Sequence, residues 1–335
     1  MRKLDNLLVT GGCGFIGSAF IRFSLAKGLR ISNLDKMTYA ADLSNLDGFH
    51  DHPNYQWIQG DINDQKLVET LCLNQKIDAI VHFAAESHVD RSIASAMPFI
   101  ETNVLGTLSL LEAIRKFPHI HFHHISTDEV YGSLGKSGMF HEESLYRPNS
   151  PYSASKAASD HLVRAYAQTY HLSTTLSHCS NNYGPHQHIE KFIPMIISNC
   201  LAEKKIPVYG QGTNVRDWIY VDDHVEAIWA ILTGAERGEV YDIGGGVERS
   251  NIELLHLVLK IIGGDIEKYR SLIHFVEDRA GHDYRYAIDS SKLIRNLGWK
   301  PTTSLEEGLR KTVHFYSQKQ KFFSKRVDEK GLLKI

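Results

Sequence analysis

The sequence lacks an excess of either charge. Lys and Arg total 37 and Asp and Glu total 39, which leaves a formal net charge of -2. This balance provides no overall field that would draw the protein to nucleic acid or to an anionic membrane. Any phosphate group that the protein binds must therefore be met by a few local cations.

Cysteine is scarce, and no two cysteines stand close together. The chain has 4 of them, at Cys13, Cys72, Cys179 and Cys200, and none forms a Cys-x-x-Cys pair. This spacing gives no indication of a zinc site, an iron–sulfur cluster or a redox dithiol. We expect reduced thiols.

Long apolar runs are also missing. No stretch of the chain reaches membrane-spanning length, and no signal-peptide core follows Met1. We therefore expect a cytoplasmic protein, with neither a membrane nor a nucleic acid as a partner.

Histidine, in contrast, is abundant at 19 residues. In the run from His119 to His124, strand alternation would place His119, His121 and His123 on one face, an arrangement that a metal ion could use. No carboxylate is interleaved there, and the run leads into a strand end that other chemistry requires. We predict no metal site.

The chain is long enough for two unequal lobes. Its 335 residues exceed one typical core, and 42% hydrophobic residues are ordinary for a globular protein. The first half alternates strand-like and helical patterns, which predicts an α/β fold with a Rossmann-type doubly wound parallel sheet and ligands at the carboxyl ends of its strands. The expected strands are 6–10, 30–35, 55–60, 79–84, 121–126 and 173–178, and the expected helices are 19–27, 65–74, 104–117 and 155–170.

The alternation breaks after about residue 180, where loops separate short helices at 192–202 and 251–262. We place a Rossmann domain at 1–180 and a smaller, mixed, substrate-binding lobe at 181–335. Within the second part, 215–245 again reads as strand, helix and strand, so we expect it to rejoin the first sheet.

A glycine-rich turn follows the first strand. Gly11, Gly14 and Gly17 stand where the strand must turn tightly, where the backbone must approach a pyrophosphate, and where the next helix must pack closely. The N-terminus of that helix would then face the phosphates. Glycine spacing alone is a weak signal, but its position between a strand and a helix predicts a dinucleotide site.

Asp35 ends the second expected strand. It would accept hydrogen bonds from the adenosine ribose and repel a 2′-phosphate, which favours NAD over NADP, although Lys36 beside it weakens that preference. The plainer alternative is that Asp35 only begins a turn. Asp61 and Ile62 follow the third strand, where an adenine amino group would be recognised.

Tyr152 and Lys156 are four residues apart and therefore share one helix face. An adjacent ammonium favours the phenolate form of a tyrosine, and such a phenolate can accept a proton from a hydroxyl group. Tyr-x-x-x-Lys pairs are also common by chance on solvated helices. The residues expected to lie near Tyr152 and Lys156 favour the catalytic interpretation of this pair.

Those neighbours are the polar residues 126–132 near the end of the fifth expected strand. Asp128 and Glu129 are adjacent there, and two carboxylates at a sheet edge are costly unless they have a use. The alternative interpretation is a capping Asp and an exposed Glu at the start of a loop.

At these residues the chain resembles the extended short-chain dehydrogenase/reductase superfamily, and within it the dTDP-glucose 4,6-dehydratase family. The resemblance runs from Leu7 to about Tyr316 and rests on the motifs at 83–92, 126–132, 152–156, 179–185, 214–218 and 278–283. It implies a hydro-lyase that holds NAD tightly and acts on a nucleotide-activated hexose.

The resemblance also implies roles for the catalytic residues. Tyr152, aided by Lys156, takes the proton of the sugar 4-hydroxyl, which Thr127 orients. Glu129 removes the C5 proton as a base, and protonated Asp128 gives its proton to the departing 6-hydroxyl. Hydride goes from C4 to NAD and returns to C6, which leaves a 4-keto-6-deoxy sugar.

The same resemblance implies which residues bind the cofactor and the substrate. NAD is expected to contact Gly11, Gly14, Phe15, Ile16, Gly17, Asp35, Lys36, Thr38, Asp61, Ile62, Phe83, Ala84, Ala85, Ser87, Thr102, Tyr152, Lys156 and Asn182. The nucleotide sugar is expected to contact Ser87, Thr127, Asn181, Lys191, Phe192, Pro207, Tyr209, Arg216, Asn251, Arg279 and His282.

Departures from the family pattern gather on the nucleotide-sugar side. His178 stands where Arg is common, and the remaining departures are His186, His188, Ile189, Val247 and Ala280. None belongs to the catalytic set. They put in doubt the shape of the loop 184–191, and therefore which base or sugar the protein binds. They do not put in doubt the type of reaction.

Other functions remain open at this point. The same dehydration could act on UDP- or CDP-linked glucose or on an N-acetylated sugar. A 4-epimerase or a UDP-glucuronate decarboxylase would also use Tyr152 and Lys156, but neither needs Asp128 and Glu129 at the 6-position. A non-catalytic NAD-binding regulator would not need the catalytic set. A homodimer is expected from the family and from the apolar helices 104–117 and 155–170.

Overall fold

The computed structural model describes residues 2–324, and side chains as far as Gln318. Its centre is a seven-stranded sheet in the order β10-β6-β5-β4-β1-β2-β3, in which every pairing is parallel. The strands are β1 (Asn6–Thr10), β2 (Arg30–Asp35), β3 (Tyr55–Gln59), β4 (Ala79–His82), β5 (His121–Thr127), β6 (Thr174–Cys179) and β10 (Val240–Ile243). The predicted Rossmann-type fold is confirmed.

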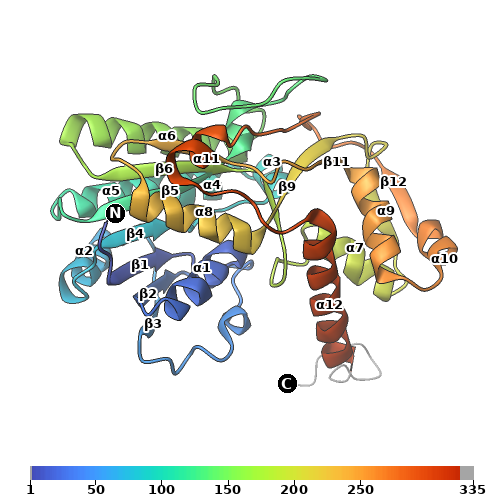
Figure 1. The fold of residues 1–335 in the computed structure, drawn as a ribbon, viewed down its shortest axis with the longest axis horizontal. Helices are drawn as coiled ribbons and strands as arrows, with labels where there is room; N and C mark the ends of the chain where they lie inside the picture. The colour runs from blue at the N-terminus through green and yellow to red at the C-terminus, as the bar shows by residue number, and fades with distance from the viewer. Residues whose placement is uncertain (1, 325–335) are drawn as a thin grey trace.

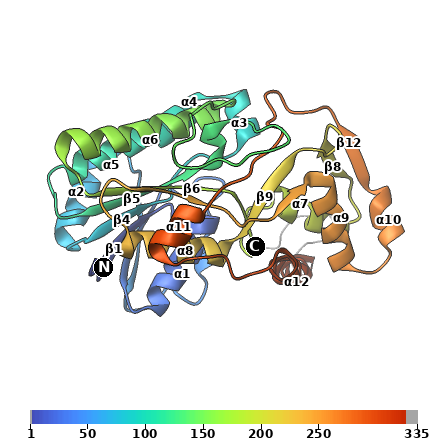
Figure 2. The ribbon, with the colours of Figure 1, turned by 45° about the horizontal axis from the view of Figure 1, so that its top comes forward.

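Helices cover both faces of this sheet (Figures 1 and 2). One face carries α1 (Phe15–Ala26), α8 (Val221–Gly234) and α11 (Ser291–Leu297). The other carries α2 (Gln65–Asn74), α5 (Gly106–Ile114) and α6 (Pro151–Tyr170). Separate apolar cores fill the two interfaces, one around Phe20 and Ile228 and the other around Leu110 and Phe122. Both faces are thus buried, as a parallel sheet requires.

Short elements connect these layers. They are the 3₁₀ turns η1 (Leu43–Leu46) and η3 (Asp128–Tyr131), the helices α3 (Val89–Ala94) and α4 (Met97–Phe99), and the π-helix η2 (Ile100–Leu105). The predicted helix 104–117 is therefore α5 preceded by a π-helical turn, and the predicted helix 155–170 begins earlier, at Pro151. Ser150 and Ser153 form a capping box there, which places Tyr152 in the first turn of α6.

A smaller lobe lies beyond the carboxyl ends of the strands, on the right in Figure 1. It contains a three-stranded sheet of β7 (Asn181–Tyr183), β9 (Val215–Tyr220) and β11 (Glu248–Ser250), and a two-stranded sheet of β8 (Ile206–Tyr209) and β12 (Ile273–Val276). Its helices are α7 (Phe192–Leu201), α9 (Asn251–Ile262), α10 (Ile266–Ser271) and α12 (Leu305–Ser324). Tyr183, Trp218 and Leu254 belong to its own apolar core.

The segment 215–245 divides between the two sheets. β10 pairs with β6 and becomes the edge of the large sheet, and α8 packs on α1. β9 does not join the large sheet as expected; it pairs with β7 and β11 instead. The sequence pattern of a strand indicates which of its residues are buried, but not which strand it pairs with. β7 follows directly after β6 and pairs with β9 in parallel. The domain boundaries at 1–180 and 181–335 stay predictions, and the second range runs past the described residues.

The histidine run enters β5 at His121, and every residue of that strand is buried, whereas His119 precedes the strand and is exposed, so it does not share a strand face with His121 and His123. His121 hydrogen-bonds Ser173 and Thr175 (both 2.9 Å), and His123 hydrogen-bonds Thr175 (2.9 Å). The neighbouring strand β6 and the residue before it therefore satisfy these rings. Between residues 2 and 324, no group of three or more His, Cys, Asp or Glu side chains is arranged to hold a metal ion. In the same range, no helix has the length and hydropathy needed to cross a membrane.

Asp223 joins α8 to the chain that enters α12. Its buried carboxylate accepts hydrogen bonds from Thr302 Oγ1 (2.8 Å) and from the backbone N–H of Thr303 (3.0 Å). We expect Asp223→Asn to lower the free energy of unfolding by about 1–3 kcal/mol, because a donor replaces one acceptor oxygen. Glu226→Gln, on the exposed side of α8, is the control and should change it by less than about 0.5 kcal/mol. Urea unfolding measures both; equal effects would contradict this role of Asp223.

Candidate active site

The turn after β1 forms a cradle of bare backbone. Gly11 has a φ of +71°, and a Cβ on it would lie 2.6 Å from the backbone nitrogen of Ala84. A Cβ on Gly17 would lie 2.4 Å from the carbonyl oxygen of Gly11. α1 begins at Phe15, and its N-cap, Gly14, has no side chain to cap it. The first-turn N–H groups are therefore left for an anion such as a pyrophosphate.

Asp35 lies at the end of β2, and its carboxylate is held by backbone. It accepts hydrogen bonds from the N–H groups of Cys13 (2.8 Å) and Met37 (2.8 Å). Burial raises the pKa of Asp35, and these two hydrogen bonds oppose the rise. Lys36 points to Asp61 instead, with a 2.6 Å ion pair between Nζ and Oδ2. Lys36 is thus engaged by a carboxylate, which reduces its availability for a 2′-phosphate.

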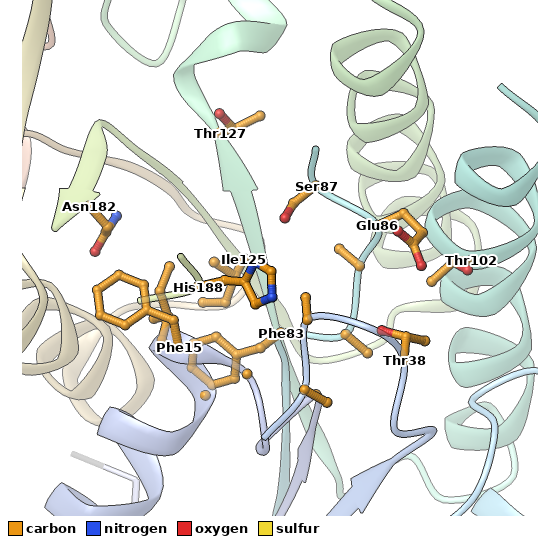
Figure 3. Close-up of a pocket in the computed structure, with 18 of the residues that line it drawn as sticks. Phe15, Thr38, Phe83, Glu86, Ser87, Thr102, Ile125, Thr127, Asn182 and His188 are labelled. Atoms are coloured by element: carbon orange, nitrogen blue, oxygen red, sulfur yellow. The ribbon is translucent and has the colours of Figure 1, made fainter. Parts of the chain in front are cut away.

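A cavity of about 320 Å³ opens above this cradle. Every residue expected to contact NAD lines it, as do the five expected catalytic residues. Figure 3 shows Phe15 and Phe83 at its floor, Thr38 and Thr102 on one side, and Thr127 at the end of β5. A glycine cradle, an acidic residue at the neighbouring strand end and this cavity together fit a dinucleotide.

Sequence reasoning missed part of the lining. Ile125 and Cys179 line the cavity from the carboxyl ends of β5 and β6, where the rule for doubly wound sheets could have found them. Glu86, His188 and Glu190 also line it. His188 and Glu190 come from the loop before α7, and no pattern in that loop indicates which side chains turn inward.

Asp128 and Glu129 form the η3 turn directly after β5. Thr127 caps this turn by accepting a hydrogen bond from Glu129 N (3.3 Å). Burial raises the pKa of Asp128 well above its usual range, and the adjacent Glu129 adds to the rise. Asp128 Oδ2 is fully buried and has no hydrogen-bond partner among the described side chains and backbone. A carboxyl group in this state can hold a proton at neutral pH and donate it to a bound ligand.

Glu129 lies between opposing influences. Burial raises the pKa of Glu129, whereas the nearby Arg216 guanidinium lowers it. Glu129 lines both this cavity and a second, neighbouring cavity, which is described below. The two adjacent carboxyl groups therefore have unequal surroundings, and unequal surroundings separate an acid from a base.

Tyr152 and Lys156 face the same cavity from α6. Burial lowers the pKa of Lys156 to about 8, and its Nζ donates a hydrogen bond to the carbonyl oxygen of Ile125 (2.6 Å). Burial and the charge of Glu129 raise the pKa of Tyr152. The adjacent Lys156 ammonium is expected to lower the pKa of Tyr152, but in the protein alone this pKa is raised. The cost of burying a phenolate outweighs the attraction of the ammonium.

A second cavity of about 460 Å³ lies between the sheet and the smaller lobe. It contains every residue expected to contact the nucleotide sugar except Thr127, which lines the first cavity. Ser87, Glu129, Asn181, Glu190 and Lys191 line both cavities. The two cavities therefore meet beside the carboxyl pair.

The cations of the second cavity have partners within the protein. Arg216 stacks on Tyr286 at 4.3 Å and donates to the carbonyl oxygen of Asp283 (3.0 Å). Arg279 makes a bidentate pair with Asp90, at 2.6 and 2.9 Å. These contacts orient two guanidinium groups whose planar forks suit phosphate oxygens.

The departures from the family pattern have different surroundings. His188 lines the first cavity and packs edge-on against Tyr39 at 5.7 Å. His186 contacts Asn45 (3.1 Å), and Ile189 is exposed. Val247 donates its N–H to Asp217 (2.9 Å), and nothing in the structure explains Ala280. His178 is buried behind the site, away from both cavities.

Comparison with known proteins places this site in a family. The family model described as GDP-mannose 4,6 dehydratase matches residues 8–312. The dTDP-glucose 4,6-dehydratase of Neisseria gonorrhoeae is 47% identical over 329 residues, which cover 93% of this chain and 95% of that protein.

Solved structures agree with the sequence match. The dTDP-glucose 4,6-dehydratase of Bacillus anthracis in complex with NAD is 43% identical, covers 96% of this chain and 99% of its own, and has a TM-score of 0.89. The NAD-bound dTDP-glucose 4,6-dehydratase DesIV of Streptomyces venezuelae is 46% identical, covers 95% and 98%, and has a TM-score of 0.90. This chain belongs to the dTDP-glucose 4,6-dehydratase family of the extended short-chain dehydrogenase/reductase superfamily.

Proposed function

We propose that this protein is an NAD-dependent hydro-lyase that converts dTDP-glucose into dTDP-4-keto-6-deoxyglucose. One observation carries the proposal: Asp128, whose burial favours its protonated form, lies beside Glu129 in the cavity that also contains Tyr152 and Lys156. An oxidation needs only the last two residues, whereas a dehydration needs all four. Family membership supports the same reaction.

The first step is oxidation of the sugar at C4. Tyr152 accepts the proton of the 4-hydroxyl, and Thr127 hydrogen-bonds that hydroxyl and directs it toward the phenol oxygen. Lys156, as an ammonium, favours the phenolate form of Tyr152. When bound against the glycine cradle, NAD takes the hydride from C4 and later returns it to C6.

The second step is loss of water across C5 and C6. A ketone at C4 acidifies the C5 hydrogen, and Glu129 removes that hydrogen as a proton. Asp128 donates its proton to the departing 6-hydroxyl, so the carbon–oxygen bond breaks with water as the leaving group. Glu129 exchanges this proton with water and then protonates C5. The proton that Tyr152 took from the 4-hydroxyl is released to solvent, and Asp128 takes a proton from solvent, so all three side chains finish in the protonation states in which they began.

Recognition of the nucleotide diphosphate falls to the second cavity. Lys191, Arg216 and Arg279 supply local positive charge, as a chain with a net charge of -2 requires, and His282, whose pKa burial lowers, lines the same cavity as a neutral imidazole. Asn251, Pro207 and Tyr209 line the same cavity. The base is the least constrained part, and the same reaction on UDP- or CDP-linked glucose or on an N-acetylated sugar is the alternative.

We also propose a cytoplasmic homodimer. Ile93, Met97, Ile100 and Leu105, from α3 to η2, are exposed apolar side chains near α6. Such a patch is suited to a second copy of the chain. The four cysteines are buried and free, which suits a reducing compartment.

The substrate proposal is tested with two nucleotide sugars. We expect the purified protein to convert dTDP-glucose into a product that absorbs near ~320 nm in base, as a 4-keto sugar does. UDP-glucose serves as the comparison and should turn over at least about tenfold less efficiently. Absence of the signal with any nucleotide-linked glucose would contradict the dehydratase; a stronger signal with UDP-glucose would change the substrate only.

The division of labour is tested with Asp128→Asn. An amide has the shape of the acid but cannot supply its proton, so elimination should slow by about 10²–10⁴-fold while oxidation at C4 survives. Reduced cofactor should therefore accumulate, with absorbance near ~340 nm in a single turnover. Tyr152→Phe is the matched control and should show neither absorbance nor product. Equal loss of both steps in Asp128→Asn would refute the assigned roles.

Retention of NAD is tested at the cradle. Gly11→Ala should yield protein that loses NAD during purification, because its Cβ would meet the backbone of Ala84 at 2.6 Å. Gly28→Ala is the control, since Gly28 also has a positive φ (+82°) but nothing within 4 Å of the added Cβ. NAD extracted from each protein by acid is the measurement. Equal NAD content in the two variants would contradict this role of the cradle.

A further inference from the structure

A row of buried ionisable side chains lies behind the candidate active site. It runs from Lys156 and Asp160 on α6, through His124 on β5 and His178 on β6, to Asp242 on β10. Of these five, only Lys156 lines either cavity. The reaction described above uses no other member of the row, although burial of so many charges is costly unless they compensate one another.

His124 is the link next to Lys156. Its Nε2 lies 3.4 Å from Lys156 Nζ and 3.3 Å from Asp160 Oδ1. Burial lowers the pKa of His124 to about 4, so its ring is neutral at pH 7. A neutral Nε2 either accepts a hydrogen bond from the ammonium or donates one to the carboxylate, but it cannot do both. The tautomer of His124 therefore depends on the protonation of Lys156.

Asp160 is held in place through its other oxygen. Oδ2 accepts hydrogen bonds from Ser126 Oγ (2.8 Å) and Tyr146 OH (3.1 Å), and it lies 3.2 Å from His178 Nε2. Burial opposes ionisation of Asp160, but its contacts with His124 and His178 hold its pKa well below the usual range. Asp160 is therefore a fixed negative charge.

His178 lies between two carboxylates. Its Nε2 contacts Asp160, and its Nδ1 lies 2.9 Å from Asp242 Oδ1. Burial opposes its charge, but the two carboxylates raise the pKa of His178 to about 9. An imidazole that donates from both nitrogens is a cation. Tyr131 OH and Tyr146 OH complete its surroundings, at 2.8 and 2.7 Å.

We propose that Asp160 and His178 are positioning residues for the oxidation step: Asp160, held by His178, is the buried counter-charge that keeps Lys156 an ammonium. The proposal rests on the function proposed above.

The groups that face Lys156 support this assignment. His82 on β4 and His124 on β5 are both neutral, because burial lowers the pKa of each. Cys179 on β6 is also uncharged at neutral pH, because burial raises the pKa of its thiol to about 12. Glu142 lies farther along the row, where it accepts a hydrogen bond from Asp242 N (3.1 Å). Asp160 is thus the anion that offsets burial of the ammonium.

A pH dependence follows, and its sign is set by Lys156. In the NAD-loaded protein the positive nicotinamide also favours the phenolate form of Tyr152, and oxidation still requires the ammonium, so its rate should fall as the pH rises through the pKa of Lys156, about 8. Without the charge of Asp160, burial of Lys156 is no longer offset and its pKa is lower. The fall in rate should then begin at a lower pH. Loss of the His178 cation should act in the same direction, because Asp160 would lose the group that keeps it ionised.

The experiment isolates oxidation by using dTDP-6-deoxyglucose, which has a 4-hydroxyl but no 6-hydroxyl to eliminate. The NAD-loaded protein is mixed with this probe between about pH 6 and pH 10, and absorbance near ~340 nm is followed in a single turnover. In Asp160→Asn we expect the alkaline fall to move down by about one pH unit, which is about a tenfold loss of rate above it. His178→Gln should move it in the same direction, and His178→Arg, which keeps a cation, should restore the wild-type position.

Asp223→Asn is the matched control, because it changes a buried, hydrogen-bonded Asp that lies outside this row. It should lower stability without moving the pH profile. A rate that falls by the same factor at every pH in both Asp160→Asn and His178→Gln would overturn the proposal. If Asp160→Asn does not fold, His178→Gln and His178→Arg decide by the same criterion. Failure of the wild-type protein to reduce its cofactor with this probe would overturn the proposed function instead.

Discussion

Exclusion of water from two adjacent carboxyl groups at the end of β5 is the constraint on which this site depends. In water Asp128 and Glu129 would both be ionised, and neither could protonate a leaving hydroxyl. Burial raises the pKa of both groups. Arg216 opposes the rise at both, but at Asp128 the charges of Glu129 and Asp217 each outweigh it, whereas at Glu129 it is the largest influence after burial. A proton donor and a proton acceptor can therefore stand side by side on one short turn.

The fold supplies the walls of that dry site. β5 is an interior strand, next to β4 and buried along its whole length, so its carboxyl end lies beside the crevice where the strand order reverses between β1 and β4. The smaller lobe closes the crevice from the other side and contributes Arg216 through β9. Because β9 pairs with β7 and not with the large sheet, it carries Arg216 to the wall of the second cavity.

The parts of the structure that local pattern controls were predictable from the sequence. Strand 6–10 and helix 65–74 have the expected bounds, because burial and periodicity are properties of consecutive residues. The pairing of β9 was not predictable, since alternation does not name a partner. The start of α6 was missed because its capping box uses Ser153, not the usual Glu or Gln. The cation at His178 also escaped prediction, because Asp160 and Asp242 approach it only in the folded chain.

In the proposed reaction, oxidation and water loss form one closed cycle, in which the hydrogen taken from C4 returns to the same sugar at C6. The most direct test is turnover of dTDP-glucose that carries deuterium at C4, followed by NMR or mass spectrometry of the product. We expect the deuterium to appear in the C6 methyl group of the same molecule, with solvent hydrogen at C5. Deuterium that is lost to solvent or retained in released cofactor would contradict it.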